Sequence, residues 1–410
     1  MTDAERLDAR RPVYWPEIRT LLLAAMVFFT FTIGIGILNG TDLVDFDHRR
    51  LLGHVHGGTL GWLTLSVFAA SLWLFGNEDA RDARQRSQVQ ALMWAAIVAF
   101  ALYVVAFTFT YNELRPVMGG ISTLAIAAFF VWIASRARRI RLGVPHIGFL
   151  VAVATSIAGG ILGVLWGLML ATGDQYLPTG GEDAHPAIMV VGFLFPVALA
   201  MSEWAFTFPS PPPATRLGVI QMVFPFLGGL VLALSLLLDV DPLAPVAILL
   251  EIVGVVIFVV RMWGNFRSVR ITEASPGRWA LLSAIGSVFV IGLAQFFVIK
   301  YEGDFDLVPE HELLALDHSQ FIASMTSAVF ALLAAATAGR IAARVQHVVF
   351  ALVSIGVTVF VIGLLSDTTA LKRIGAPTMG IGLLLGLATF AIAVAQDRPR
   401  STATVAALPA

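Results

Sequence analysis

Residues 49–62, RRLLGHVHGGTLGW, place two histidines, His54 and His56, at the start of an otherwise apolar run. An ionisable side chain deep in lipid costs on the order of 2–3 kcal/mol, so two histidines here point to a function. Residues two apart on an α-helix are separated by a rotation of about 200°, so the two imidazoles face opposite sides of their helix. One helix can therefore contribute to two sites, one on each flank.

The composition predicts a polytopic membrane protein. The chain has 410 residues, of which 58% are hydrophobic and 13% charged, whereas a soluble domain has about 25% charged residues. The net charge of −1 gives no reason to expect a nucleic-acid partner. Cysteine is absent, which excludes disulfides, thiolate metal sites, iron–sulfur clusters and covalent c-type haem attachment. Any metal site must therefore use histidines and carboxylates.

Apolar runs of about 20 residues, each long enough to cross a bilayer core of about 30 Å, recur along the chain. They predict an all-α integral membrane fold of twelve transmembrane helices, followed by a disordered tail at 397–410. The predicted spans are 18–39, 51–75, 88–111, 117–135, 146–172, 185–206, 217–238, 245–265, 279–300, 318–339, 346–365 and 378–396.

The distribution of basic residues predicts the orientation of these spans. With the N-terminus inside, only six of the 26 lysines and arginines fall in outer segments, namely Arg49, Arg50, Arg115, Lys300, Lys372 and Arg373. Cytoplasmic segments of membrane proteins carry the excess of positive charge. We therefore expect both termini in the cytoplasm, in a bacterial-type plasma (inner) membrane, with the lipid bilayer as the main partner.

Four histidines lie at outer ends of spans in this topology. His54 and His56 lie at the start of span 2, His185 opens span 6 and His318 opens span 10. A histidine at the outer end of every fourth helix predicts three four-helix units, arranged as pseudo-symmetric arcs. The other four histidines lie at boundaries or in loops, and we interpret them as interfacial: His48, His146, His311 and His347.

With these residues in place, the chain resembles subunit I of the haem–copper oxidase superfamily, which includes cytochrome c oxidases and bacterial nitric oxide reductases. His56-Gly57 is similar to the helix-2 ligand of the low-spin haem, and His318-Ser319-Gln320 to the helix-10 segment. The string from His54 to Trp62 is closer to the helix-10 signature of C-family oxidases, whose two histidines bind two haems. His185-Pro186 resembles the helix-6 histidine that binds copper B. Lys372-Arg373 falls in the loop where the family binds haem propionates.

The chain also departs from this family. Span 7 contains Phe224-Pro225-Phe226 and no histidine, so the copper B histidine pair is missing. Leu316 stands where the family has the ligand of the high-spin haem. A complete binuclear centre cannot be assembled, so copper is not expected and no catalytic residue is assigned.

The resemblance and the chemistry of imidazole together predict haem b between spans 2 and 10, with His56 and His318 as axial ligands. Arg49, Arg50, Lys372 and Arg373 would bind the propionates. Outer carboxylates would orient the imidazoles: Asp183, Asp317 or Glu312. His54 and His185, on the other flank, would hold a second haem or a copper ion, although two nitrogen ligands make a weak metal site.

These features favour a haem protein for electron transfer or for oxygen or nitric oxide chemistry, with a redox partner or oxidase subunits. A cofactor-free transporter or channel is the first alternative, in which Glu251 and Glu203 inside the spans would carry the function. The second alternative is an assembly or haem-delivery partner of an oxidase. Gly57, Gly58 and Gly61 fit either a flat macrocycle against the backbone or ordinary close helix packing.

Overall fold

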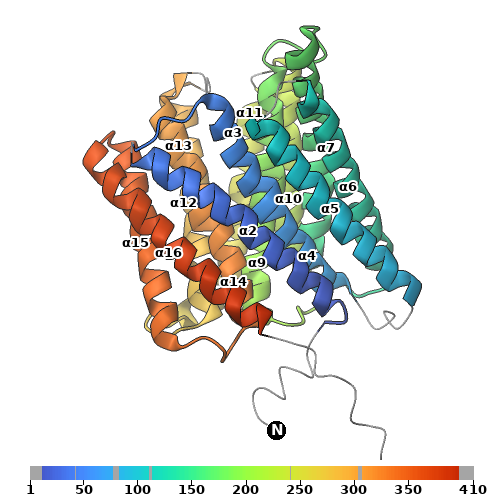
Figure 1. The fold of residues 1–410 in the computed structure, drawn as a ribbon, viewed down its shortest axis with the longest axis vertical. Helices are drawn as coiled ribbons and strands as arrows, with labels where there is room; N and C mark the ends of the chain where they lie inside the picture. Colours follow the sequence, from blue (N-terminus) through green and yellow to red (C-terminus); the bar gives the residue numbers. More distant parts are fainter. Residues whose placement is uncertain are drawn as a thin grey trace, which may run out of the picture.

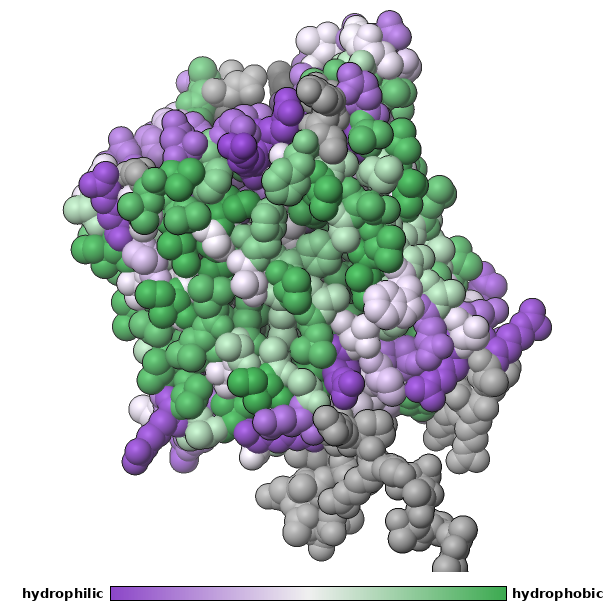
Figure 2. All heavy atoms as spheres, viewed as in Figure 1, coloured by the Kyte–Doolittle hydropathy of each residue, from purple (hydrophilic) through white to green (hydrophobic). Residues whose placement is uncertain are grey.

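The computed structural model of the protein describes residues 12–41, 43–76, 83–109, 113–240, 242–302 and 307–396, which form helices joined by short connections and contain no β-strand. Twelve helical spans in these residues are long and apolar enough to cross a membrane, which confirms the predicted all-α fold. Apolar side chains form a belt around the middle of the molecule, and polar side chains gather at its two ends (Figure 2). The predicted tail at 397–410 lies outside the described residues.

Some spans are interrupted by a change of helix type, and these pieces are labelled separately. In chain order the elements are α2 (Trp15–Gly40), α3 (His48–His56), η1 (Gly57–Thr64), α4 (Leu65–Phe75), α5 (Ala83–Phe109), α6 (Leu114–Ala137), α7 (Val144–Thr172), η3 (Gly181–Asp183), α8 (Ala184–Ala187), η4 (Ile188–Leu194), α9 (Phe195–Thr207), α10 (Arg216–Leu238), α11 (Leu243–Ser268), α12 (Pro276–Lys300), α13 (Glu310–His318), η6 (Ser319–Thr326), α14 (Ser327–Ala336), α15 (Ala343–Leu365) and α16 (Thr369–Ala395).

Two spans begin eight or nine residues earlier than the sequence predicted, and the others begin within five residues of the predicted start. The tenth begins at Glu310 rather than near residue 318, and the twelfth begins at Thr369 rather than near residue 378. Their first turns are polar, so hydropathy alone missed them, and α16 continues through Pro377 although proline usually ends or kinks a helix. Lys372-Arg373 therefore lies in the first turns of α16 and not in a loop.

Three spans form the centre of the bundle. In the apolar 18-residue stretch of each span, the buried share is 83% for α3–η1–α4, 67% for α8–η4–α9 and 78% for α13–η6–α14. In the other spans it is at most 50%. The other nine surround them, with α16 beside α2 and α15 beside α16 (Figure 1). Central burial recurs at every fourth span. The grouping into three four-helix arcs stays a prediction, and this recurrence supports it.

Buried tryptophans join the central spans. Trp62 of η1 donates a hydrogen bond from Nε1 to Oγ1 of Thr326 in η6, at 3.1 Å. The same indole stacks on Phe29 of α2, with ring centroids 4.7 Å apart. Because a buried indole N–H needs a partner, this bond fixes the second span against the tenth.

The two ends of the bundle differ in chemistry. We call the end at which α3, α8 and α13 begin the histidine face, and it lies uppermost in Figure 1. The end at which α4, α9 and α14 finish is called the opposite face. Asp47 caps the first turn of α3 by accepting a hydrogen bond from the backbone N–H of Arg50 at 2.9 Å, so α3 begins at His48 and presents His54 and His56 about two turns further along.

Candidate functional site

Each central span changes from α-helix to π-helix within three residues of its histidine. The segment η1 follows His56, η6 follows His318, and η4 begins three residues after His185. In η1 and η6 a threonine hydroxyl donates to the carbonyl five residues earlier, Thr64 to Thr59 at 2.9 Å and Thr326 to Phe321 at 2.8 Å. π-Helical turns are rare and are frequent at functional sites. The same local structure thus recurs beside the histidines of all three central spans.

His54 and His185 each form a hydrogen bond with the span that precedes them. Nδ1 of His54 lies 2.8 Å from the carbonyl oxygen of Thr32 in α2, and Nδ1 of His185 lies 2.7 Å from that of Gly159 in α7. Since a carbonyl only accepts, Nδ1 carries the proton in both rings.

His56 and His318 each form the corresponding bond within their own helix. Nδ1 of His56 donates to the carbonyl of Leu52 at 2.8 Å, and Nδ1 of His318 donates to that of Leu314 at 2.8 Å. All four rings therefore carry a proton on Nδ1, and in the neutral form of each ring Nε2 has a free lone pair. Among the described residues, none of these Nε2 atoms has a hydrogen-bond partner. A histidine that ligates a metal usually has this arrangement, with its other ring nitrogen bonded to a carbonyl or carboxylate.

His146 shows by contrast what a structural histidine looks like in this chain. It accepts a hydrogen bond at Nδ1 from the backbone N–H of Gly143 at 3.0 Å and donates from Nε2 to the carbonyl of Leu74 at 3.1 Å. Both ring nitrogens are used, so His146 holds the start of α7 and is buried rather than interfacial. His347 accepts a hydrogen bond from Arg278 at 2.8 Å.

The electrostatic neighbours of the four histidines differ from the pairs that the sequence predicted. His54 lies close enough to His318 for their imidazoles to interact electrostatically, and His56 lies close enough to His185. The sequence led us to pair His56 with His318 and His54 with His185. The spacing of two residues shows that the two imidazoles of α3 face opposite flanks of the helix. Which neighbouring helix lies on each flank depends on the order of the helices around the bundle, and the spacing does not reveal that order.

The flanks of α3 are defined by the neighbouring helices. His54 faces α2, where a side chain at Gly36 would lie 3.1 Å from Cε1 of the imidazole. His56 faces α5 and stacks on Phe107, with centroids 4.1 Å apart and planes at 24°. On the partner side, Phe360 lies 4.9 Å from the ring of His318 and Trp166 lies 6.2 Å from that of His185. Both pairs therefore lie among apolar and aromatic side chains.

Arg115 is a functional candidate that the sequence did not single out. Its side chain is 7% exposed, its guanidinium lies 4.3 Å above the ring of Phe107, and Nε has no hydrogen-bond partner among the described residues. It interacts electrostatically with His56 and with Arg49. A buried guanidinium without a carboxylate attracts an anion. An arginine in the first turn of an apolar helix was the only sign of it in the sequence.

The predicted basic residues lie at the histidine face but differ in their surroundings. Arg49 and Arg50 are exposed in the first turn of α3, and Arg50 forms an ion pair with Asp47 at 3.5 Å. Lys372 donates a hydrogen bond to Asp367 at 3.0 Å, which lowers the pKa of that carboxyl. Arg373 is exposed.

The predicted role for outer carboxylates as partners of the imidazoles is wrong. Backbone carbonyls accept the hydrogen bond from every one of the four imidazoles, and Glu312 instead accepts one from Lys300 at 2.7 Å. A carbonyl on a helix is already fixed in place, so it orients a ring without placing a further charge in the bilayer.

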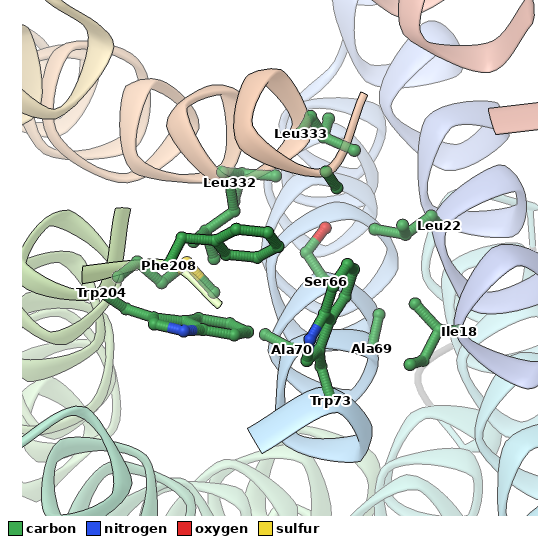
Figure 3. A pocket seen from close by; sticks show the side chains of 13 residues that line it. Ile18, Leu22, Ser66, Ala69, Ala70, Trp73, Trp204, Phe208, Leu332 and Leu333 are labelled. Carbon is green, nitrogen blue, oxygen red and sulfur yellow. The ribbon is translucent and has the colours of Figure 1, made fainter. Parts of the chain in front are cut away.

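The pairs do not combine into a larger metal site. Among the described residues no group of three or more histidines, aspartates and glutamates comes together. An apolar pocket does lie at the opposite face, lined by Trp73, Trp204 and Phe208, with the hydroxyl of Ser66 turned into it (Figure 3). Ser66 is ten residues beyond His56 on the same span, roughly 15 Å away, so this pocket is not part of the histidine sites.

Gly163 provides a test of how tightly His185 is held. A methyl group at this position would lie 2.7 Å from Cε1 and 2.8 Å from Nδ1 of His185, and the ring can retreat only by losing its bond to Gly159. We expect Gly163→Ala to lower the free energy of unfolding by about 1–3 kcal/mol, measured by thermal unfolding in detergent. Gly167→Ala on the same helix is the control, because its nearest neighbour would be 3.5 Å away. Equal effects of the two substitutions would contradict the tight fit.

Comparison with protein families and curated sequences adds no information about the histidine pairs. No protein-family model and no curated protein sequence matches the chain. Function must therefore be inferred from the site itself.

Proposed function

We propose that the chain binds two haem groups near the histidine face, one between His54 and His318 and one between His56 and His185. The observation that supports this most is the shared state of the four rings, each with Nδ1 bonded to a carbonyl and Nε2 without a partner. A pair of imidazoles is too few for a bare metal ion, but it is the number of axial ligands that a haem iron lacks. The residues present therefore fit the group.

The surroundings of the pairs agree with this cofactor. Apolar and aromatic side chains suit a porphyrin face, and Arg115 beside His56 offers a cation for a propionate. Arg49 lies near the same guanidinium. Because the chain has no cysteine, the haem would be of the non-covalent b type.

We propose electron transfer as the activity. A bound haem would supply one-electron redox chemistry, and if two histidines held it, no ligand position would remain open for a gas. Turnover of oxygen or nitric oxide would require one histidine to leave. The protein's contribution is to fix two imidazoles per site, to keep water out with apolar side chains, and to balance propionate charge with Arg115.

The setting proposed for this activity is a bacterial-type plasma membrane with both termini in the cytoplasm, so that the histidine face is external. The excess of basic residues at the opposite face supports it. A redox partner or oxidase subunits would then dock at the external side. The resemblance to haem–copper oxidase subunit I stays part of this proposal.

Purification of the full chain followed by absorbance and pyridine-haemochrome measurement tests the proposal. We expect a Soret band, a reduced α-band, two haems per chain, and no spectral shift when carbon monoxide is added to the reduced protein. A shift with carbon monoxide would indicate an exchangeable ligand and favour the haem-delivery alternative. A colourless protein that stays colourless after incubation with haem would contradict the proposal and favour the cofactor-free transporter.

A further inference from the structure

Glu251 is a buried carboxyl group that the haem sites do not use. It lies in α11 with 2% of its surface exposed, and neither carboxyl oxygen has a hydrogen-bond partner among the described residues. The carboxyl packs against α10 at Gly228, where a side chain would collide with Oε1. The absence of a side chain at Gly228 thus makes room for a carboxyl group in the interior of the bundle.

No charge stabilises this group. Apart from Glu251, the charged residues of α11 and of the helices packed against it lie nearer the helix ends. They are Arg216 on α10, Arg278 and Lys300 on α12, Glu203 on α9, and Arg261 and Arg267 on α11. No ion pair with Glu251 is found in the described part of the chain. An isolated carboxylate in an apolar medium is so costly that the group takes up a proton instead. We therefore expect Glu251 to be a neutral carboxylic acid.

Polar groups lead towards Glu251 from the opposite face. Arg261 binds Glu203 through two hydrogen bonds of 2.8 Å, and Gln221 donates to the same carboxylate at 3.1 Å. Because Pro225 has no N–H, the backbone carbonyl of Gln221 does not receive the usual helical hydrogen bond from the residue four positions later. The oxygen of this carbonyl faces Gly254 on α11, and a Cβ atom added to Gly254 would lie 3.2 Å from it. Gly254 is about one helical turn from Glu251.

From the histidine face no such series is found among the described residues, because the only polar side chain of α10 and α11 there is Ser235, whose hydroxyl donates to the carbonyl of Val240 at 2.9 Å. We propose that Glu251 is a protonation site within the membrane, and that it exchanges its proton with water at the opposite face along the α10–α11 interface. The proton moves between water and the carboxyl group, so no other reactant is required. This proposal does not depend on haem binding.

Infrared spectroscopy of the full chain in lipid vesicles tests the protonation state. We expect the carbonyl band of a protonated carboxylic acid in the wild type. The band should shift after transfer to D2O and should be absent from Glu251→Gln.

Should Glu251→Gln fail to fold, labelling of the wild type by the apolar reagent dicyclohexylcarbodiimide gives a second measurement. The acid adds across a C=N bond of the reagent, its proton passes to nitrogen, and peptide mass spectrometry should find the adduct on Glu251 but not on Glu203. Absence of both the band and the adduct would overturn the proposal.

Access from the opposite face is tested by Gln221→Leu, which places an apolar side chain in the polar series. We expect the acid band to remain and its exchange in D2O to slow by roughly tenfold or more, because the proton must then cross an apolar segment. Gln295→Leu on α12 is the matched control and should leave the exchange rate unchanged. An unchanged exchange rate in Gln221→Leu would overturn the proposed route. The exchange rates can be measured whether or not the purified protein contains haem, so the test is independent of haem binding.

Discussion

Replacement of His318 by alanine is expected to remove one of two haems and to leave the spectrum of the other unchanged. The same haem should be lost from His54→Ala, because these two imidazoles form one pair. His56→Ala and His185→Ala should each remove the other haem. Pyridine-haemochrome content per chain and the reduced spectrum of each variant give the measurement.

Double substitutions separate this pairing from the one that the sequence predicted. His54→Ala/His318→Ala should keep one haem per chain, whereas His56→Ala/His318→Ala should keep none. The reverse result would restore the sequence-based pairing. His146→Ala is the control for loss of a buried histidine, because both its ring nitrogens bond within the protein and its loss should affect stability rather than haem content.

Loss of Arg261 is expected to destabilise the protein by about 3–5 kcal/mol, the usual cost of leaving one partner of a buried ion pair alone. Arg261→Leu removes both hydrogen bonds to Glu203, whose side chain is only 5% exposed, and leaves Gln221 as its remaining donor. Thermal unfolding in detergent should show a markedly lower Tm, with haem content per folded chain unchanged because the pair lies at the opposite face.

Arg267→Leu is the matched control, because Arg267 is exposed near the end of the same helix. Its effect should stay within about 0.5 kcal/mol, as for most surface substitutions. A loss of stability in Arg267→Leu equal to that in Arg261→Leu would show that lost positive charge, rather than the broken pair, is responsible.

The sequence predicted those features that depend on composition along one helix. Runs of apolar residues gave twelve spans, and a separation of two residues placed His54 and His56 on opposite flanks. Features that depend on neighbouring helices were not predictable, which is why the sequence-based pairing of the imidazoles differs from the one we now propose. Arg115 was missed for the same reason, since its closeness to His56 arises from the packing of α6 beside α5.

The π-helical segments were also beyond prediction. They begin with Gly57-Gly58, Ile188-Met189 and Ser319-Gln320, which share no residue type, and only η1 and η6 end in a threonine, Thr64 and Thr326. Contacts between the central spans add to the local structure there, as in the bond from Trp62 to Thr326. Carbonyl partners of the imidazoles were missed because backbone acceptors leave no mark in the sequence.

The placement of His54 and His56 on one short helix has a thermodynamic consequence. Only Val55 separates the two histidines, so in the proposed arrangement any displacement of α3 that improves one coordination bond would also move the other. If binding of haem at the first site changes the affinity of the second site by some factor, binding at the second site changes the affinity of the first by the same factor. Titration of haem into the apoprotein should therefore be described with cooperative constants, and the reduction potentials of the two irons should respond to each other.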